Sequence, residues 1–393
     1  CSGAKMAPTA LFTHVKQPML KRRSREIASE GVIKAQEWIG GQDKPVVESK
    51  ILAFQNALNT CTSRQELDSV LAENIRPCSF RPFVNSNALL WGTIFDYQAG
   101  IGGGGARVRP EIKAVYDLPD TVGFSLAHAP KDLDESLGQF TSFCWYFPDN
   151  DLSRRGNGHI YLNHYIRDVH TNAVINNIHQ SLIERYSALT GLDDSEGAKK
   201  MVFYSYAVFC SQVYLEEFYG ALFVVNQSES RARIPIVDDA GLFLRLAELG
   251  ERLAILEKND AAVDNVLDFN YDELLAQMWT GFHLEHSRSA SRSPYDEENE
   301  QLIVRDEVTG NSIRIYCPVS LQKFTIAGYN VIKDCWLKFH SYRFTHCDFT
   351  RDDLKELLDL FNKIASQMGI VSEIDEIMHS IVGGEVALLN YND

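Results

Sequence analysis

Apolar side chains recur at helical spacing in several parts of the chain. Gly241–Leu256 places five leucines on one stripe, and Asp352–Met368 repeats the same three- and four-residue spacing. Met201–Val225 is apolar nearly all round, which predicts a pair of buried helices. Helical spacing also covers Glu48–Leu58 and Asp168–Tyr186, and Ser63-Arg64-Gln65-Glu66 resembles a capping box ahead of a further helix.

Other stretches have the texture of strands and turns. From Phe80 to Phe147 the residues are aromatic and β-branched and are interrupted by Gly and Pro at short intervals. Leu11–Val15 predicts a short strand that runs into a helix of mixed charge. Gln301–Val308 and Asn311–Cys317 predict a hairpin, and the Ser- and Arg-rich residues 286–300 predict a mobile loop.

These patterns predict a mixed α/β (α+β) fold with a strand-rich N-terminal half that also carries helices. The C-terminal half is predicted to be rich in helices and to contain a β-hairpin. The chain of 393 residues is long enough for two or three domains. We place a domain boundary between an N-terminal lobe, residues 1–190, and a C-terminal lobe, residues 191–393.

Composition indicates an ordinary globular protein, with 45% hydrophobic and 23% charged residues. The net charge of −15 disfavours a nucleic-acid partner, because binding to phosphates depends on Lys and Arg. That sum nevertheless hides basic clusters at Lys16–Arg25, Arg107–Lys113 and Arg154-Arg155. No apolar run reaches the ~18–20 residues of a membrane span and no signal-peptide pattern is present, so a cytoplasmic location is predicted. The start at Cys1, without Met, suggests a piece of a longer protein.

Potential metal ligands do not form a recognisable set. The eight cysteines include no C-x-x-C pair, which argues against a zinc knuckle or a redox dithiol and favours free thiols. Two groups lack the spacing or the fourth partner of a zinc site and are interpreted as ordinary side chains: His159, His164, His170 and His179, and then His340, His346 and Cys347.

Catalytic motifs are missing as well. Gly100–Gly105 superficially echoes the glycine loop around S-adenosylmethionine in methyltransferases, but Pro110 and charged residues follow it instead of an apolar helix. A turn or a DNA-facing loop is therefore favoured there. The sequence has no G-x-x-x-x-G-K-[ST] loop, no Asn-Pro-Pro-Tyr or Asp-Pro-Pro-Tyr and no G-x-S-x-G elbow, so no catalytic residue is assigned.

Several motifs occur in the order seen in one family of specificity regions. Arg233-Ile234-Pro235-Ile236 precedes a Leu- and Gly-containing helix, and Phe324–Ile332 is followed by Trp336-Leu337-Lys338. With Phe80-Arg81-Pro82-Phe83, Tyr204–Tyr214 and a closing helix through Asp375, the chain resembles the C-terminal specificity region of type ISP restriction–modification enzymes. Val84 stands where the family usually has Asp, and Phe339–Arg343 replaces a Gly-Arg turn.

The resemblance implies a function without catalysis by this chain alone. Such enzymes combine nuclease, translocase, methyltransferase and specificity parts, and the specificity part recognises a target in double-stranded DNA. S-adenosylmethionine then belongs to the methyltransferase part, and no cofactor is expected in this chain. The lobe 1–190 is interpreted as a target-recognition lobe and the lobe 191–393 as a type ISP-like specificity lobe.

Two other functions remain open. The acidic surface favours a protein-interaction or scaffold module of a phage-defence complex that docks a basic partner. A complete S-adenosylmethionine-dependent DNA methyltransferase that uses Gly100–Gly105 is a third possibility, although it would need a base-binding motif that the chain lacks.

Under the DNA-recognition hypothesis, loop Arg and Asn side chains are suited to base edges and lysines to phosphates. The predicted DNA-binding residues are Arg81, Arg107, Arg109, Arg154, Arg155, Asn157, Lys323 and Lys338. The alternative for the loop residues and lysines is a solvated charge. Arg81 is equally suited to bracing the fold through backbone carbonyls, and Tyr329 and Trp336 are predicted to pack in the core.

Overall fold

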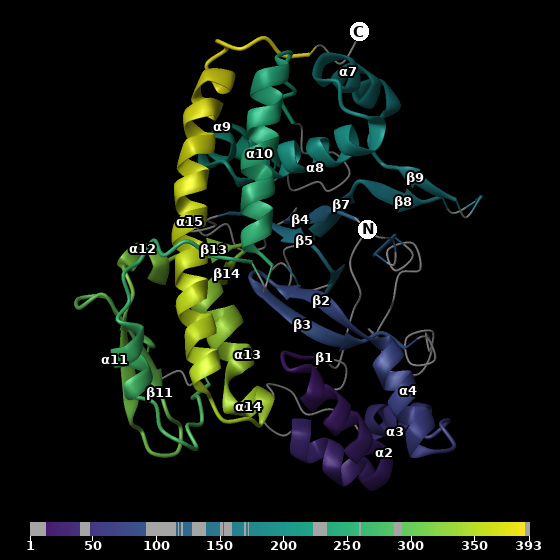
Figure 1. Ribbon diagram of the computed structural model, residues 1–393, viewed down its shortest axis with the longest axis vertical. Coiled ribbons are helices and arrows are strands. Elements are labelled where there is room, and N and C mark those ends of the chain that lie inside the picture. Colours follow the sequence, from purple (N-terminus) through teal and green to yellow (C-terminus); the bar gives the residue numbers. More distant parts are fainter. Residues whose placement is uncertain are drawn as a thin grey trace.

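The computed structural model confirms the mixed α/β fold, in which helices pack around several small sheets (Figure 1). The residues that it describes are 13–39, 48–91, 115–116, 118, 121–127, 139–149, 152, 159–168, 170–171, 173–222, 234–258, 261–286 and 293–389. Within that part of the chain, no helix combines the length and apolarity needed to cross a bilayer.

Among the residues that the structure describes, the helices are short except for four of 17 residues or more. In chain order they are α2 (Gln17–Ile39), α3 (Glu48–Leu58), α4 (Arg64–Asn74), α7 (Gln180–Thr190), α8 (Asp194–Cys210), α9 (Gln212–Leu222), α10 (Ala240–Leu256), α11 (Tyr271–Ala276), α12 (Val319–Gln322), the π-helix η1 (Val331–Leu337), α13 (Lys338–His340), α14 (Tyr342–Thr345) and α15 (Arg351–Val382).

The strands belong to separate small sheets with the orders β1-β3-β2-β6, β5-β4-β7, β8-β9, β10-β11-β12 and β13-β14. Their bounds are β1 (Thr13–His14), β2 (Ile75–Arg81), β3 (Val84–Leu89), β4 (Gly123–Ala127), β5 (Thr141–Cys144), β6 (Phe147–Pro148), β7 (His159–Asn163), β8 (Tyr165–Arg167), β9 (Val174–Asn176), β10 (Tyr295–Asp296), β11 (Gln301–Arg305), β12 (Ser312–Tyr316), β13 (Thr325–Ile326) and β14 (Tyr329–Asn330).

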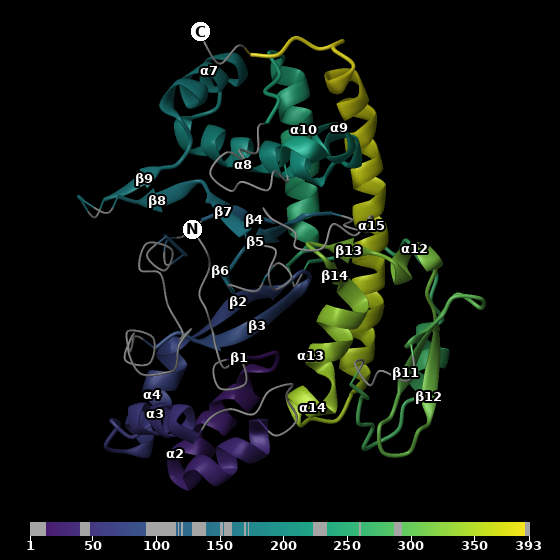
Figure 2. The same ribbon diagram turned by 180° about the vertical axis from the view of Figure 1, so that it is seen from behind.

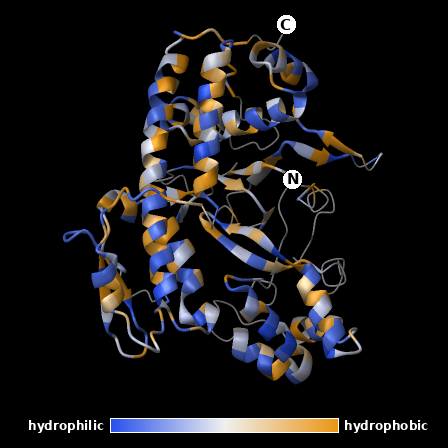
Figure 3. Cartoon of the chain, viewed as in Figure 1, coloured by the Kyte–Doolittle hydropathy of each residue, from blue (hydrophilic) through white to orange (hydrophobic). Residues whose placement is uncertain are grey.

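The C-terminal half is organised by α8, α10 and α15. Helix α15 begins with a capping box formed by Thr350 and Asp353, and it lies between α10 and the β10-β11-β12 sheet in both views (Figures 1 and 2). Hydrophobic and hydrophilic residues alternate along α10 and α15 as amphipathic helices require (Figure 3). Gly250 of α10 lets the two backbones approach closely, because a Cβ there would lie 2.0 Å from the carbonyl oxygen of Phe203 in α8.

The N-terminal half places its small sheets between a helical lobe and the C-terminal helices. Strand β2 pairs antiparallel with β3 and parallel with β6. The α2–α4 lobe lies at the opposite end of the molecule from α7 (Figures 1 and 2). One continuous hydrophobic core runs from Leu20 to Ile381. The domain boundary at residue 190 stays a prediction.

The predicted helices are largely confirmed, and α3 has the predicted bounds. Helix α15 extends to Val382, well past the predicted end at Met368. The predicted helical stretch Asp168–Tyr186 is wrong in its first part. There β9 ends at Asn176 and α7 begins at Gln180, because cross-strand pairing overrides the local spacing.

Two further predictions need correction. Of the loop predicted over residues 286–300, residues 287–292 lie outside the described part, and Tyr295–Asp296 forms strand β10 against β11. The buried strand edge predicted around Tyr329 is short, because the chain turns into a π-helix at Val331. Trp336 is nevertheless buried in the core as predicted, whereas Tyr329 is half-buried.

Candidate nucleic-acid interface

Acidic side chains are sparse between Asp151 and Glu184. These 32 residues contain one acidic side chain, Asp168, against three arginines and four histidines. They include strand β7 and both strands of a two-stranded element, β8-β9, called the ribbon from here on. Because phosphate contacts favour such a surface, the sheet β5-β4-β7 and the ribbon form the candidate interface.

The sheet is held against helix α8 by aromatic packing. Strand β4 pairs antiparallel with both β5 and β7, so it occupies the centre of the sheet. Phe143 of β5 stacks on Phe203 at 5.5 Å between ring centroids, and Phe124 of β4 packs on Phe209 at 5.8 Å. The sheet is thereby a rigid base for the elements attached to it.

The junction between the sheet and the ribbon is fixed by hydrogen bonds around residues 163 and 164. The Asn177 side chain donates to the carbonyl oxygen of Asn163 at 2.9 Å, and its backbone N–H donates to the carbonyl of His164 at 2.7 Å. The buried His164 exchanges hydrogen bonds with the backbone of Val122, the residue directly before β4. The ribbon is therefore anchored at its base on the centre of the sheet.

The ribbon extends from the body at the edge of the molecule in both views (Figures 1 and 2). Ile166 faces Ile175 across the two strands, and both are exposed, with 38% and 43% of their surface accessible. The neighbouring pairs, Tyr165 with Asn176 and Arg167 with Val174, lie on the other face because successive residues of a strand alternate. An apolar pair thus occupies a surface position.

Asp168 fixes the turn that closes the ribbon. Its Oδ1 atom accepts hydrogen bonds from the backbone N–H groups of His170 and Thr171 and from the Thr171 hydroxyl, at 2.7 to 2.9 Å. The bonds from Thr171 and His170 lower the pKa of Asp168. The only carboxylate of this stretch is therefore committed to the turn.

The ribbon and its anchor were not among the residues predicted from the sequence. The signal that could have found them is the Asp168-x-x-Thr171 turn, in which the Asp side chain accepts a hydrogen bond from the backbone two residues further along the chain. That turn is flanked by Tyr165-Ile166 and Val174-Ile175, pairs of aromatic and β-branched residues that favour strands. The helical spacing of Asp168–Tyr186 includes the helix that begins at Gln180, so the whole stretch was predicted as helical and the turn was not recognised.

A buried carboxylate joins the candidate interface to the C-terminal helices. Glu257, directly after α10, accepts hydrogen bonds from the Ser142 hydroxyl at 2.6 Å, from the Phe143 N–H at 3.0 Å and from the Tyr206 hydroxyl. Burial raises its pKa to about 7 in spite of these three donors. Nearby, the Trp145 indole donates to the carbonyl of Ala254 at 2.6 Å.

Arg81 is the most buried of the predicted DNA-binding residues that the structure describes. Its guanidinium pairs with the buried Asp149 at 2.9 Å, donates to the Phe80 carbonyl and lies over the rings of Phe80 and Phe339. This geometry favours the bracing role over a DNA contact. The role of Arg81 in DNA binding stays a prediction.

The two predicted lysines lie apart from the ribbon. Lys323 is 63% exposed and pairs with Glu297 at 3.0 Å, and the Lys338 ammonium lies over Phe339 at 4.8 Å. Five predicted residues lie outside the described part of the chain, so the structure does not place them: Arg107, Arg109, Arg154, Arg155 and Asn157. The glycine run Gly100–Gly105 lies outside it as well.

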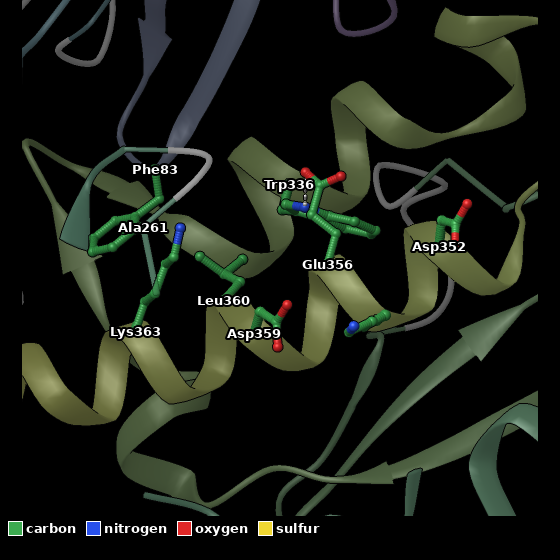
Figure 4. Close-up of a pocket in the computed structure, with 9 residues that line it drawn as sticks. Phe83, Ala261, Trp336, Asp352, Glu356, Asp359, Leu360 and Lys363 are labelled. Carbon is green, nitrogen blue, oxygen red and sulfur yellow. Dashed lines mark hydrogen bonds between the residues drawn. The ribbon is translucent and has the colours of Figure 1, made fainter. Parts of the chain in front are cut away.

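A hollow on helix α15 has the wrong chemistry for phosphate. It has a volume of about 230 Å³ and is lined by three carboxylates, those of Asp352, Glu356 and Asp359, and two lysines (Figure 4). Glu356 accepts from the Trp336 indole at 3.3 Å. Within the described ranges no group of three His, Cys, Asp or Glu side chains is placed to hold a metal ion.

Comparison with known families shows to which family the chain belongs. The sequence model of the Type ISP C-terminal specificity domain matches residues 13–378. The chain belongs to this family. The comparison with curated proteins gives no match.

Solved structures of related architecture support the assignment of the specificity-domain fold. The ATP-dependent Type ISP restriction–modification enzyme LlaBIII, solved bound to DNA, aligns with a TM-score of 0.52 at 14% identity, over 95% of this chain and 23% of that one. The DrdV–DNA complex aligns with a TM-score of 0.54 at 15% identity, over 96% of this chain and 35% of that one. The specificity domain thus spans about a quarter to a third of these longer chains.

Proposed function

We propose that this specificity domain recognises a target sequence in double-stranded DNA on behalf of a restriction–modification enzyme and is not catalytic by itself. Membership of the Type ISP C-terminal specificity domain family carries the proposal. LlaBIII and DrdV, which share the fold, were each solved in complex with DNA. The stretch between Asp151 and Glu184 adds suitable charge, with three arginines against one carboxylate.

The catalytic steps belong to other domains of the same enzyme. Nuclease, translocase and methyltransferase domains are the proposed partners, and S-adenosylmethionine binds the methyltransferase domain rather than this chain. The proposed location is the cytoplasm, where such an enzyme meets DNA.

One observation favours a second function, that of an acidic protein-docking module. Residues 191–393 carry 34 Asp and Glu against 18 Lys and Arg, which suits a basic protein partner. Binding to duplex DNA distinguishes the two functions. A docking module that has lost DNA recognition binds no duplex at low salt.

The test is fluorescence anisotropy of the 393-residue chain with a random-sequence duplex pool at low and physiological salt. We expect salt-sensitive binding, because the release of counterions from DNA on binding becomes less favourable as the salt concentration rises. Calorimetry with S-adenosylmethionine should show no heat of binding. Failure to bind DNA at low salt contradicts DNA recognition and favours the docking module.

Paired variants test the loop arginines. Arg154→Ala with Arg155→Ala should weaken binding, and the slope of log affinity against log salt should fall by about 1.8 if both guanidinium groups also neutralise phosphates in the groove. The matched control is Arg245→Ala with Arg252→Ala, which removes the same charge from exposed side chains that pair with Glu373. Equal effects of the two double variants contradict the assigned location.

A further inference from the structure

The ribbon exposes an apolar pair without a covering element among the described residues. Ile166 and Ile175 are cross-strand neighbours on one face of the ribbon, and 38% and 43% of their surfaces are exposed. Single exposed apolar residues are common, but a directly paired couple on two strands of three residues each forms a concentrated feature. A two-stranded hairpin is marginal in water by itself, so the chain maintains this feature through the anchor at its base.

The ribbon is also held in one shape at both ends. Asn177 and His164 fix its base to the sheet, and Asp168 closes its tip through three accepted hydrogen bonds. A recognition element gains affinity when it is ordered before binding, because less conformational entropy is then lost. Rigidity and exposure together point to a contact surface.

The sequence around the ribbon, with three arginines between Asp151 and Glu184, favours an anionic occupant. The stretch from Asp151 to Glu184 has a single internal carboxylate, that of Asp168, and the turn engages its Oδ1 atom. A basic protein partner is disfavoured at this surface, whereas a polyanion is favoured. A double helix offers in addition a groove that admits a two-stranded β-ribbon and thymine methyl groups that accept apolar contacts.

We propose that the ribbon enters the major groove of the target DNA, with Ile166 and Ile175 in contact with thymine methyl groups. This inference rests on the proposed DNA-recognition function and names the element that reads bases. The ribbon is a specificity element that adds apolar base contacts to those expected of the loop arginines, while the lysines are suited to phosphates.

The test separates specific from non-specific binding. A target is first selected from the random pool by repeated binding and amplification with the wild-type chain. Ile166→Ser with Ile175→Ser should weaken binding to the selected target about tenfold or more, while affinity for the random pool changes less than about threefold. Unchanged discrimination between target and pool overturns the inference.

The matched control changes two exposed apolar residues elsewhere, Val308→Ser with Leu189→Ser, and should leave discrimination intact. Melting temperatures of both double variants check folding. If the serine variant melts early, Ile175→Glu changes one exposed residue and should weaken binding to both DNAs. Val308→Glu, at a position 70% exposed, should not, and equal binding by both glutamate variants overturns the inference.

Uracil in place of thymine tests the methyl contacts directly. The wild-type chain should lose affinity for a selected target in which every thymine is replaced, and the serine variant should lose much less. Equal losses overturn the methyl contact. If the wild-type chain fails to bind any DNA, the proposed function itself fails, whereas normal binding with ribbon variants that behave like wild type removes only the inference.

Discussion

Residues 1–190 and 191–393 are similar in length and differ sharply in charge. The first region carries 20 Lys and Arg against 19 Asp and Glu, and the second carries 18 against 34. The whole acidic surplus therefore belongs to the region built around α8, α10 and α15. The net charge of the entire chain says little about the partner of the small sheets and the ribbon, because electrostatic attraction depends on the local surface.

The two regions share one hydrophobic core, and polar contacts at their seam fix their relative position. Glu257 follows α10 and holds β5 through Ser142 and Phe143. Arg81 ends β2, pairs with Asp149 and lies over Phe339 of the second region. The two regions thus differ in net charge but pack together as one body. Changes at the seam therefore test how far each region depends on the other.

The largest effect is expected from Arg81→Met. The change leaves Asp149 buried without its guanidinium partner, and breaking a buried ion pair in this way costs about 3–5 kcal/mol. Chemical denaturation should show that loss in the free energy of unfolding. Adding Asp149→Asn should recover part of it, since the unpaired charge is then removed. Wild-type stability combined with weakened DNA binding would instead assign Arg81 to the DNA contact.

Glu257 gives a pH-dependent test of the seam. Its pKa of about 7 in the folded protein lies above the ordinary value of 4.5, so folding favours the protonated form. The resulting stabilisation is complete below pH 4.5 and is lost as pH rises through 7. Relative to Glu257→Gln, the wild-type free energy of unfolding should fall by about 2–3 kcal/mol between pH 5 and pH 8.

Urea denaturation of the wild-type chain and of Glu257→Gln at four pH values measures this difference. The comparison cancels other titrating groups, such as Glu307, whose pKa burial also raises. A difference independent of pH would show that Glu257 has an ordinary pKa, because its three hydrogen-bond donors then offset the effect of burial. DNA affinity of the variant at pH 5 should match that of the wild type.

Helices with a strong apolar stripe were predictable from the sequence, and small strands were not. The Gly241–Leu256 stripe gives α10 directly, because burial of that face is decided within the helix. Strands β9 and β10 are only three and two residues long, so too few positions alternate to show a strand pattern. Each forms through pairing with a neighbouring strand, β8 or β11, which local spacing does not show. The π-helix at Val331 has no local signal at all.

The candidate site was predictable in its chemistry rather than in its geometry. Basic loop residues are visible in the sequence, but the burial of Arg81 depends on Asp149, which is 68 positions away. The shifted pKa of Glu257 likewise arises from burial beneath β5, which no pattern around residue 257 reveals. The exposed Ile166–Ile175 pair required the cross-strand register.

The smallest effect is expected inside the acidic region, at the crossing of α8 and α10. Gly250→Ala places a Cβ against the Phe203 carbonyl, so the helices must separate, at a cost of about 1–3 kcal/mol. Gly369→Ala is the matched control, because that helical position has no atom within 4 Å of the added Cβ and should gain about 0.5–1 kcal/mol. Melting curves measure both variants. If the acidic region acts only as a scaffold, the folded Gly250→Ala protein should bind DNA with the affinity of the wild type. A loss of discrimination between target and random DNA would instead show that the crossing of α8 and α10 also sets the position of the ribbon.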